Sequence, residues 1–217
     1  MRVAPTNNSS FPRRRELSDF FDGGPTSLGL RLRGTTFDFE LENSLARIPY
    51  ADPAVDLATA ELAEQIKRER GGKLLNLYRM LLHSPPVARG WLNMFTAIRQ
   101  QADLPGRDRE LATLRVAVLN GADYEFRQHI PFALTHGLTQ MQIDAINSDP
   151  GSELFTVRDR AVLAYTDAVT RNIRVPADVF ERVRAHFPPR ELVELTVTIA
   201  GYNLVSRFLE ALDIDHE

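Results

Sequence analysis

Two ionisable side chains in one short stretch of this sequence could move protons together. Glu125 and His129 lie four residues apart in the segment DYEFRQHIPFALTHG, and residues four apart share one face of a helix. A carboxylate can orient a neighbouring imidazole and raise its basicity, and the imidazole exchanges protons near neutral pH. The alternative is an ordinary surface ion pair. Apolar bulk around the pair argues against that alternative: Tyr124, Phe126, Ile130 and Phe132.

Three further residues could complete such a site. Glu110 stands near the start of the preceding helical segment, from which its carboxylate could fold back onto the same pocket as a second proton relay. Tyr124 precedes Glu125 and could hold a substrate oxygen. Arg115 lies within an apolar helical stretch, where it either clamps a substrate carboxylate or pairs with Glu110 or another acid.

The composition excludes several kinds of chemistry. The 217 residues include no cysteine, which excludes disulfides, thiolate metal sites and a thiol peroxidase mechanism. The sequence has no HExxH motif, no phosphate-binding loop and no glycine-rich dinucleotide fingerprint. A metal site built from Glu110, Glu125 and His129 is possible in principle and leaves a metal-dependent enzyme as an alternative, but it lacks a second suitable histidine, so we expect no metal.

Charge and hydropathy give no reason to expect a nucleic acid or a membrane as the partner. The formal net charge of −3 gives no electrostatic reason to expect nucleic acid or an anionic membrane. No uncharged apolar run approaches the length of a membrane span. The arginines near the start are not followed by the hydrophobic region of a signal peptide. We therefore expect a cytoplasmic protein.

Helices must position these side chains, and the sequence predicts an all-α domain over residues 46–217. Helical spacing of apolar residues begins after Asp52-Pro53, which resembles an N-cap followed by proline at the first helical position. Capping-box patterns at 139–142 and 156–159 predict two further helix starts. Pro131 falls inside the predicted helix that carries His129, where it removes a backbone hydrogen bond.

The two ends of the chain suggest self-association. Residues 1–45 hold no helical period and are predicted to form an N-terminal extension, either flexible or packed on a neighbouring protomer. Four phenylalanines favour the second alternative: Phe20, Phe21, Phe37 and Phe39. The last helical segment, ELVELTVTIAGYNLVSRFLEAL, is apolar around much of its circumference, which predicts burial on several sides and a homo-oligomer.

Three blocks of sequence resemble the carboxymuconolactone decarboxylase family, in the wide sense that includes the alkylhydroperoxidase-D-like proteins. They are LLHSPPVARGWLNMFTAIR, LPGRDRELATLRVAVLNGADYEFRQHIPFALTHGLT and ELVELTVTIAGYNLVSRFLEALDI. The likeness covers about residues 46–214. It implies an all-helical bundle that assembles into trimers or hexamers.

The resemblance also places the candidate site in a family pattern. Redox-active relatives have a glutamate, then Cys-x-x-Cys, then a histidine four residues after the second cysteine. Glu110 and His129 match the glutamate and the histidine, whereas Ala122 and Glu125 occupy the cysteine positions. The sequence therefore resembles the cysteine-less branch, whose Tyr-Glu-aromatic-x-x-His pattern is supplied by residues 124–129.

The resemblance implies an acid/base enzyme that needs no cofactor. Relatives with lactone decarboxylase activity act on a carboxylated enol-lactone, so we expect decarboxylation or isomerisation of a small carboxylated or enolisable compound. His129 would be the general acid/base, Glu125 would orient it or share its proton, and Glu110 would be the second relay. Arg115 or Tyr124 would hold substrate oxygens.

A different class of function remains open: a non-catalytic helical oligomer that binds a small molecule or serves as a scaffold. In such a protein the His129–Glu125 pair would be structural. A pocket beside the pair would favour the enzyme, and a closed His129 would favour the scaffold.

Overall fold

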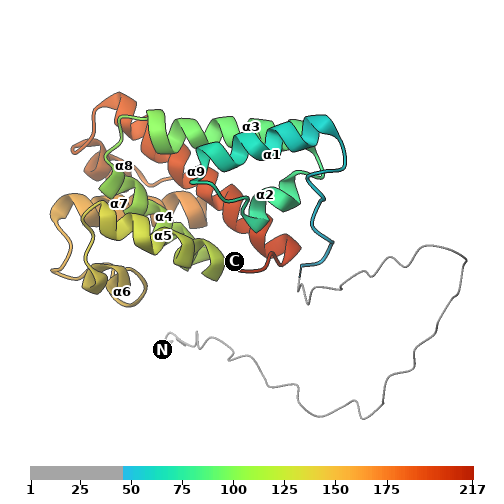
Figure 1. The fold of residues 1–217 in the computed structure, drawn as a ribbon. Helices are drawn as coiled ribbons and strands as arrows, with labels where there is room; N and C mark the ends of the chain where they lie inside the picture. The colour runs from blue at the N-terminus through green and yellow to red at the C-terminus, as the bar shows by residue number, and fades with distance from the viewer. Residues whose placement is uncertain (1–45) are drawn as a thin grey trace, which may run out of the picture. The chain divides into compact units, whose positions relative to one another are not determined.

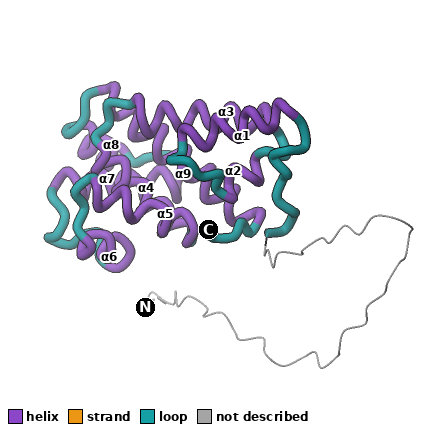
Figure 2. The backbone as a smooth tube through the Cα atoms, viewed as in Figure 1, coloured by secondary structure: helices purple, strands orange, loops and turns teal. Residues whose placement is uncertain are grey.

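Helices form the regular structure of residues 46–217, the residues that the computed structural model describes (Figure 1). No strand occurs among them, so the described fold is all-α, as predicted (Figure 2). The helices are α1 (Leu57–Glu69), α2 (Asn76–Leu81), α3 (Pro85–Thr96), the π-helical turn η1 (Ala97–Gln101), α4 (Gly106–Asn120), α5 (Asp123–Thr135), α6 (Gln140–Ser148), α7 (Val157–Asn172), α8 (Ala177–Arg184) and α9 (Pro189–Leu212).

The centre of the bundle is α4, which packs most extensively against α9, α5 and α7. Every residue from Asp108 to Ala117 is buried. Charged side chains in such a helix need partners, because an unpaired buried charge is costly. Asp108 accordingly accepts from Arg158 of α7 at 2.6 Å between Nη2 and Oδ2. This helix therefore brings ionisable groups into the interior, where their environment can control their protonation.

The helix starts predicted from local sequence are confirmed for α6 and α7 and are wrong for α1. Thr139 and Thr156 each form a complete capping box at the start of α6 and α7. The first helix starts later than predicted, because its N-cap is Asp56 rather than Asp52. Asp52 Oδ1 instead accepts from the backbone N–H of Ala54 at 2.8 Å, which closes a turn before the helix.

The last helix, α9, is apolar on two sides. One side is buried in the core and carries Leu195, Ile199 and Leu209. The other side leaves Val193, Val197 and Leu204 exposed. An exposed apolar stripe is consistent with an interface, and the homo-oligomer stays a prediction.

The predicted N-terminal extension, including its four phenylalanines, lies outside the described residues. Among the helices that are described, none combines the length and the apolar character needed to cross a membrane.

Candidate functional site

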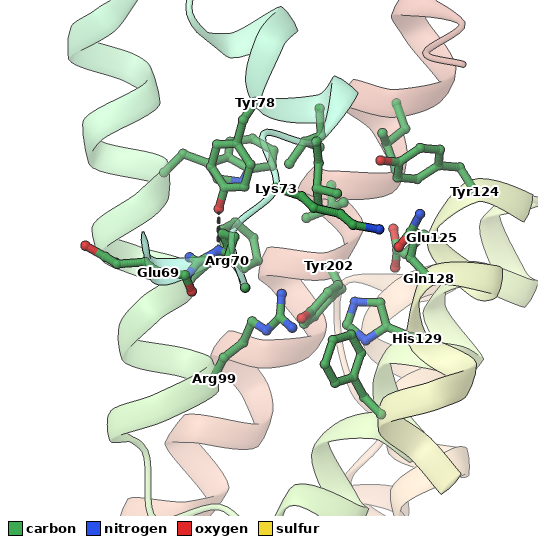
Figure 3. Close-up of a pocket in the computed structure, with 18 of the residues that line it drawn as sticks. Glu69, Arg70, Lys73, Tyr78, Arg99, Tyr124, Glu125, Gln128, His129 and Tyr202 are labelled. Carbon is green, nitrogen blue, oxygen red and sulfur yellow. Dashed lines mark hydrogen bonds between the residues drawn. The ribbon is translucent and has the colours of Figure 1, made fainter. Parts of the chain in front are cut away.

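A cavity of about 420 Å³ lies beside His129 (Figure 3). Its walls come from the end of α1 and the loop that follows, from α2, α3 and η1, and from α5 and α9. Much of the lining is apolar or aromatic: Leu75, Leu77, Tyr78, Trp91, Phe95, Phe132, Val205 and Leu209. A largely apolar cavity with a few polar groups is typical of a small-molecule site.

The imidazole of His129 is held from behind by a buried carboxylate. His129 Nδ1 lies 2.6 Å from Glu110 Oε2, and the two residues are 7% and 1% exposed. Burial alone would raise the pKa of Glu110, but the hydrogen bond and charge of His129 and the charge of Arg109 together lower it. Glu110 is thus an ionised group that fixes the orientation of the ring.

The hydrogen bonds behind His129 continue to the surface. The second oxygen of Glu110, Oε1, accepts from Arg109 Nε at 3.1 Å. Arg109 Nη2 in turn lies 3.1 Å from His136 Nε2. A side chain at Gly106 would overlap the ring of His136, so glycine allows that ring to approach the start of α4. Both oxygens of Glu110 are therefore satisfied.

Glu125 does not pair with His129 as predicted. It is 2% exposed, and its Oε2 accepts from Ser206 Oγ of α9 at 2.8 Å. Its other oxygen, Oε1, has no hydrogen-bond partner in the described part of the chain. Burial raises the pKa of Glu125 well above its ordinary value, and the hydrogen bond from Ser206 offsets this only in part. Glu125 lines the cavity, and its burial favours the neutral form of the carboxyl group.

The tertiary packing of the helices explains why His129 pairs with Glu110 rather than with Glu125. Spacing of four residues does place Glu125 and His129 on one face of α5. The packing of α4 against α5 then brings Glu110 to the imidazole, while Glu125 reaches α9 instead. Glu110 itself does not line the cavity, so it acts through His129.

A tyrosine that the sequence did not single out also faces the cavity. The Tyr202 ring meets His129 edge to face, with centroids 4.9 Å apart. Its hydroxyl is buried and has no hydrogen-bond partner within residues 46–217. Tyr124 lines the cavity as well, but its hydroxyl donates to Glu217 Oε1 at 2.9 Å. Of Tyr124 and Tyr202, the phenol without a hydrogen bond to residues 46–217 is therefore that of Tyr202.

Arg115 is not a substrate clamp in this cavity. Its guanidinium forms a two-pronged pair with Asp167 of α7, at 2.6 and 2.8 Å, and Nη1 donates to the carbonyl of Ile146 at 2.6 Å. Arg115 is absent from the cavity lining. Five residues along a helix correspond to a rotation of about 140°, which directs Arg115 away from the side of α4 that carries Glu110. The prediction of a pairing with an acid is correct, and that acid is Asp167.

Two cations that the sequence did not single out line the cavity, Arg99 and Lys73. Figure 3 shows Arg99 directed toward Tyr202 and His129, and Lys73 directed toward Glu125 and Gln128. Arg99 is part of η1, a π-helical turn of the kind often found at functional sites. Both cations lie outside the segment 110–129 that the sequence singled out. The signal that the sequence offered was Arg99, which follows the apolar residues of a predicted helix.

A third cation in the lining, Arg70, already has hydrogen-bond partners. Arg70 Nε donates to the hydroxyl of Tyr78 at 2.8 Å, and its Nη2 donates to Thr96 Oγ1 at 3.0 Å. The neighbouring Glu69 offsets its charge, and the same Thr96 hydroxyl donates to that carboxylate at 2.6 Å.

Within residues 46–217 no group of three or more histidine, aspartate or glutamate side chains has a metal-binding arrangement.

Comparison with known proteins agrees with the fold. The model of the carboxymuconolactone decarboxylase family matches residues 85–168. An uncharacterized protein of Bacillus subtilis (strain 168), YdfG, is 25% identical over 115 residues, which are 52% of this chain and 78% of that protein.

Solved structures give the same result. A protein of unknown function from Agrobacterium tumefaciens, described as a putative antioxidant defence protein AhpD, is 28% identical. The match covers 62% of this chain and 93% of that one, with a TM-score of 0.59. An uncharacterized peroxidase-related protein of Ralstonia eutropha JMP134, with an alkylhydroperoxidase AhpD core, is 17% identical. The match covers 79% of this chain and 92% of that one, with a TM-score of 0.68. At this identity the likeness supports the fold and nothing more.

Proposed function

This cysteine-free chain belongs to the carboxymuconolactone decarboxylase-like proteins of the AhpD-like superfamily, and we propose that it is a cofactor-independent acid/base enzyme. Its substrate is a small carboxylated or enolisable compound, which it decarboxylates or isomerises. The observation that carries the proposal is an imidazole held by an ionised carboxylate on one side and open to a cavity on the other.

The geometry of His129 supports a proton shuttle. Its Nδ1 is engaged by Glu110, so Nε2 is the ring nitrogen left for the substrate. Neutral His129 removes a proton from an acidic carbon, and the Glu110 carboxylate stabilises the imidazolium that forms. Helix-borne side chains hold this geometry without reorganisation, as such chemistry requires.

Glu125 supplies a different function from the one its spacing suggested. As a neutral acid it donates a hydrogen bond to a substrate oxygen on which negative charge develops. In isomerisation the electrons of the broken C–H bond move to that oxygen, and the proton returns from His129 to another carbon. In decarboxylation the C–C bond breaks, carbon dioxide leaves, and the carbon of the resulting enolate takes up a proton that His129 Nε2 has received from solvent.

The test is proton exchange in heavy water. We expect the wild-type protein to incorporate deuterium into, or decarboxylate, members of a panel of carboxylated enol-lactones and oxo acids, followed by nuclear magnetic resonance. His129→Gln should lower the rate by about 10²–10⁴-fold with the helical circular dichroism unchanged. His186→Gln is the matched control, because His186 does not line the cavity.

Equal rates for His129→Gln and wild-type protein would overturn the acid/base proposal. Binding of panel compounds without turnover in wild-type protein would favour the non-catalytic binding function instead.

A further inference from the structure

Two buried polar atoms at the cavity have nothing to bond to within residues 46–217. They are Glu125 Oε1 and the hydroxyl of Tyr202, and both residues line the cavity on either side of His129. Buried polar atoms in native proteins almost always have a hydrogen-bond partner, so each exception calls for an explanation. A ligand that carries oxygen in this part of the cavity would satisfy both atoms.

The cavity also contains two positively charged side chains, Arg99 and Lys73. Neither the guanidinium of Arg99 nor the ammonium of Lys73 forms a hydrogen bond or an ion pair with residues 46–217. Arg99 does stack on the ring of Phe132, with 4.9 Å between its Cζ and the ring centroid. The lining has three cations, Arg70, Lys73 and Arg99, against the carboxyl groups of Glu69 and Glu125, and burial favours the neutral form of Glu125, so the cavity suits an anion.

Aromatic rings form the rest of the wall. Trp91 and Phe95 have centroids 5.1 Å apart, and Phe95 meets Tyr202 edge to face at 5.6 Å. Such a wall contacts a flat unsaturated ring over a large apolar area and in favourable ring geometries. A small, fully hydrophilic acid would leave this surface uncovered. The wall therefore selects for an apolar, planar body.

We propose that the substrate is an enolisable 2-oxo acid with an aromatic or other planar apolar body. Its carboxylate binds Arg99, its oxo oxygen binds between Glu125 and Tyr202, and its acidic carbon faces Nε2 of His129. The reaction part of this inference rests on the proposed function, whereas the ligand class rests only on the cavity.

The reaction is a keto–enol isomerisation that needs no co-reactant. His129 Nε2 takes a proton from the carbon next to the oxo group, and the electrons of that C–H bond form the new C=C bond. The former carbonyl pair moves to oxygen, which takes a proton from the Glu125 carboxyl. Proton transfer from His129 back to Glu125 through the product or water restores both groups.

Three probes separate the parts of the proposed ligand. Phenylpyruvate has the ring, the oxo group and the carboxylate; pyruvate lacks the ring; phenylacetone lacks the carboxylate. Trp91 is the sole tryptophan of the chain and lines the cavity, so its fluorescence reports binding, and calorimetry gives an independent dissociation constant. We expect phenylpyruvate to bind at least about tenfold more tightly than either partial probe, since one lost charged hydrogen bond or ring contact has about that effect.

Arg99→Gln tests the charge. It should weaken phenylpyruvate binding by about tenfold or more and leave phenylacetone binding unchanged. Arg89→Gln, on α3 and outside this cavity, is the matched control and should leave both dissociation constants unchanged. Equal affinity for pyruvate and phenylpyruvate, or no effect of Arg99→Gln, would overturn the proposed ligand class.

Deuterium exchange at the methylene carbon of phenylpyruvate separates the two proposals. Selective binding of phenylpyruvate without exchange beyond the His129→Gln level would support the ligand class and defeat the acid/base function. Exchange or decarboxylation that favours compounds without a ring would support the acid/base function and defeat the ligand class.

Discussion

The two sides of His129 contain the same kind of side chain in opposite states. Behind the ring, Glu110 has both oxygens hydrogen-bonded and a lowered pKa. In front of it, Glu125 has one oxygen without a partner among the described residues and a raised pKa. Both carboxyl groups are almost fully buried. Burial thus does not decide ionisation by itself: the hydrogen bonds and charges of His129 and Arg109 lower the pKa of Glu110, whereas only the hydrogen bond from Ser206 opposes the effect of burial on the pKa of Glu125.

This difference separates support from binding. A saturated network holds its members in one arrangement, because any displacement breaks hydrogen bonds at low dielectric. A network with unpaired buried polar atoms is destabilising until a ligand forms the missing hydrogen bonds. The side of α4 therefore positions the imidazole, and the side of α9 presents hydrogen-bonding capacity to the cavity.

The largest effect should come from a substitution of Glu110, in the hydrogen-bonded network behind His129. Glu110→Gln removes the carboxylate from a buried pair and leaves His129 and Arg109 without their anion. We expect a loss of about 3–5 kcal/mol in the free energy of unfolding, measured by urea denaturation. The control is Glu64→Gln, which breaks an exposed pair with Lys67 and should cost at most about 1 kcal/mol. Similar losses for the two variants would mean that Glu110 is not an essential support.

The second effect concerns the pH dependence of Glu125. Its carboxyl group holds a proton in the folded protein at pH values where the unfolded chain has released one, because its folded pKa is the higher. Wild-type stability should therefore fall with rising pH, by about 1.4 kcal/mol per pH unit, from near pH 4.5 up to the raised pKa. Glu125→Gln cannot ionise and should lack this component.

Denaturation curves of both proteins across pH 5 to 8 measure the Glu125 effect. The variant should gain stability relative to wild type as the pH rises. Parallel pH profiles for the two proteins would show that Glu125 is not held neutral.

The smallest effect should come from Ser206→Ala. It removes the hydrogen bond to Glu125 Oε2 and leaves the rest of α9 unchanged. We expect a loss of about 1 kcal/mol in the free energy of unfolding and a further rise in the pKa of Glu125, read from the shifted pH profile. Ser148→Ala, at an exposed serine of α6, is the control. A stability loss as large as that of Glu110→Gln would contradict the contrast between the two sides.

Much of the fold follows from local sequence. The capping boxes at Thr139 and Thr156 fix two helix starts, because side-chain and backbone groups within four residues satisfy each other. The start of α1 was misplaced, since Asp52 can close a turn as readily as cap a helix. Such local competition is not resolved by residue type alone.

What the sequence by itself determined is the set of helices, the absence of thiol chemistry, and a histidine four residues from a glutamate on one helix face. Tertiary structure decided which carboxylate binds that histidine, because the choice between Glu110 and Glu125 depends on how α4 and α9 pack against α5. The tertiary structure likewise pairs Arg115 with Asp167 and places Arg99 in the lining of the cavity. A helix fixes the direction of a side chain within a few residues, whereas the partner of a buried charge comes from segments far away in sequence.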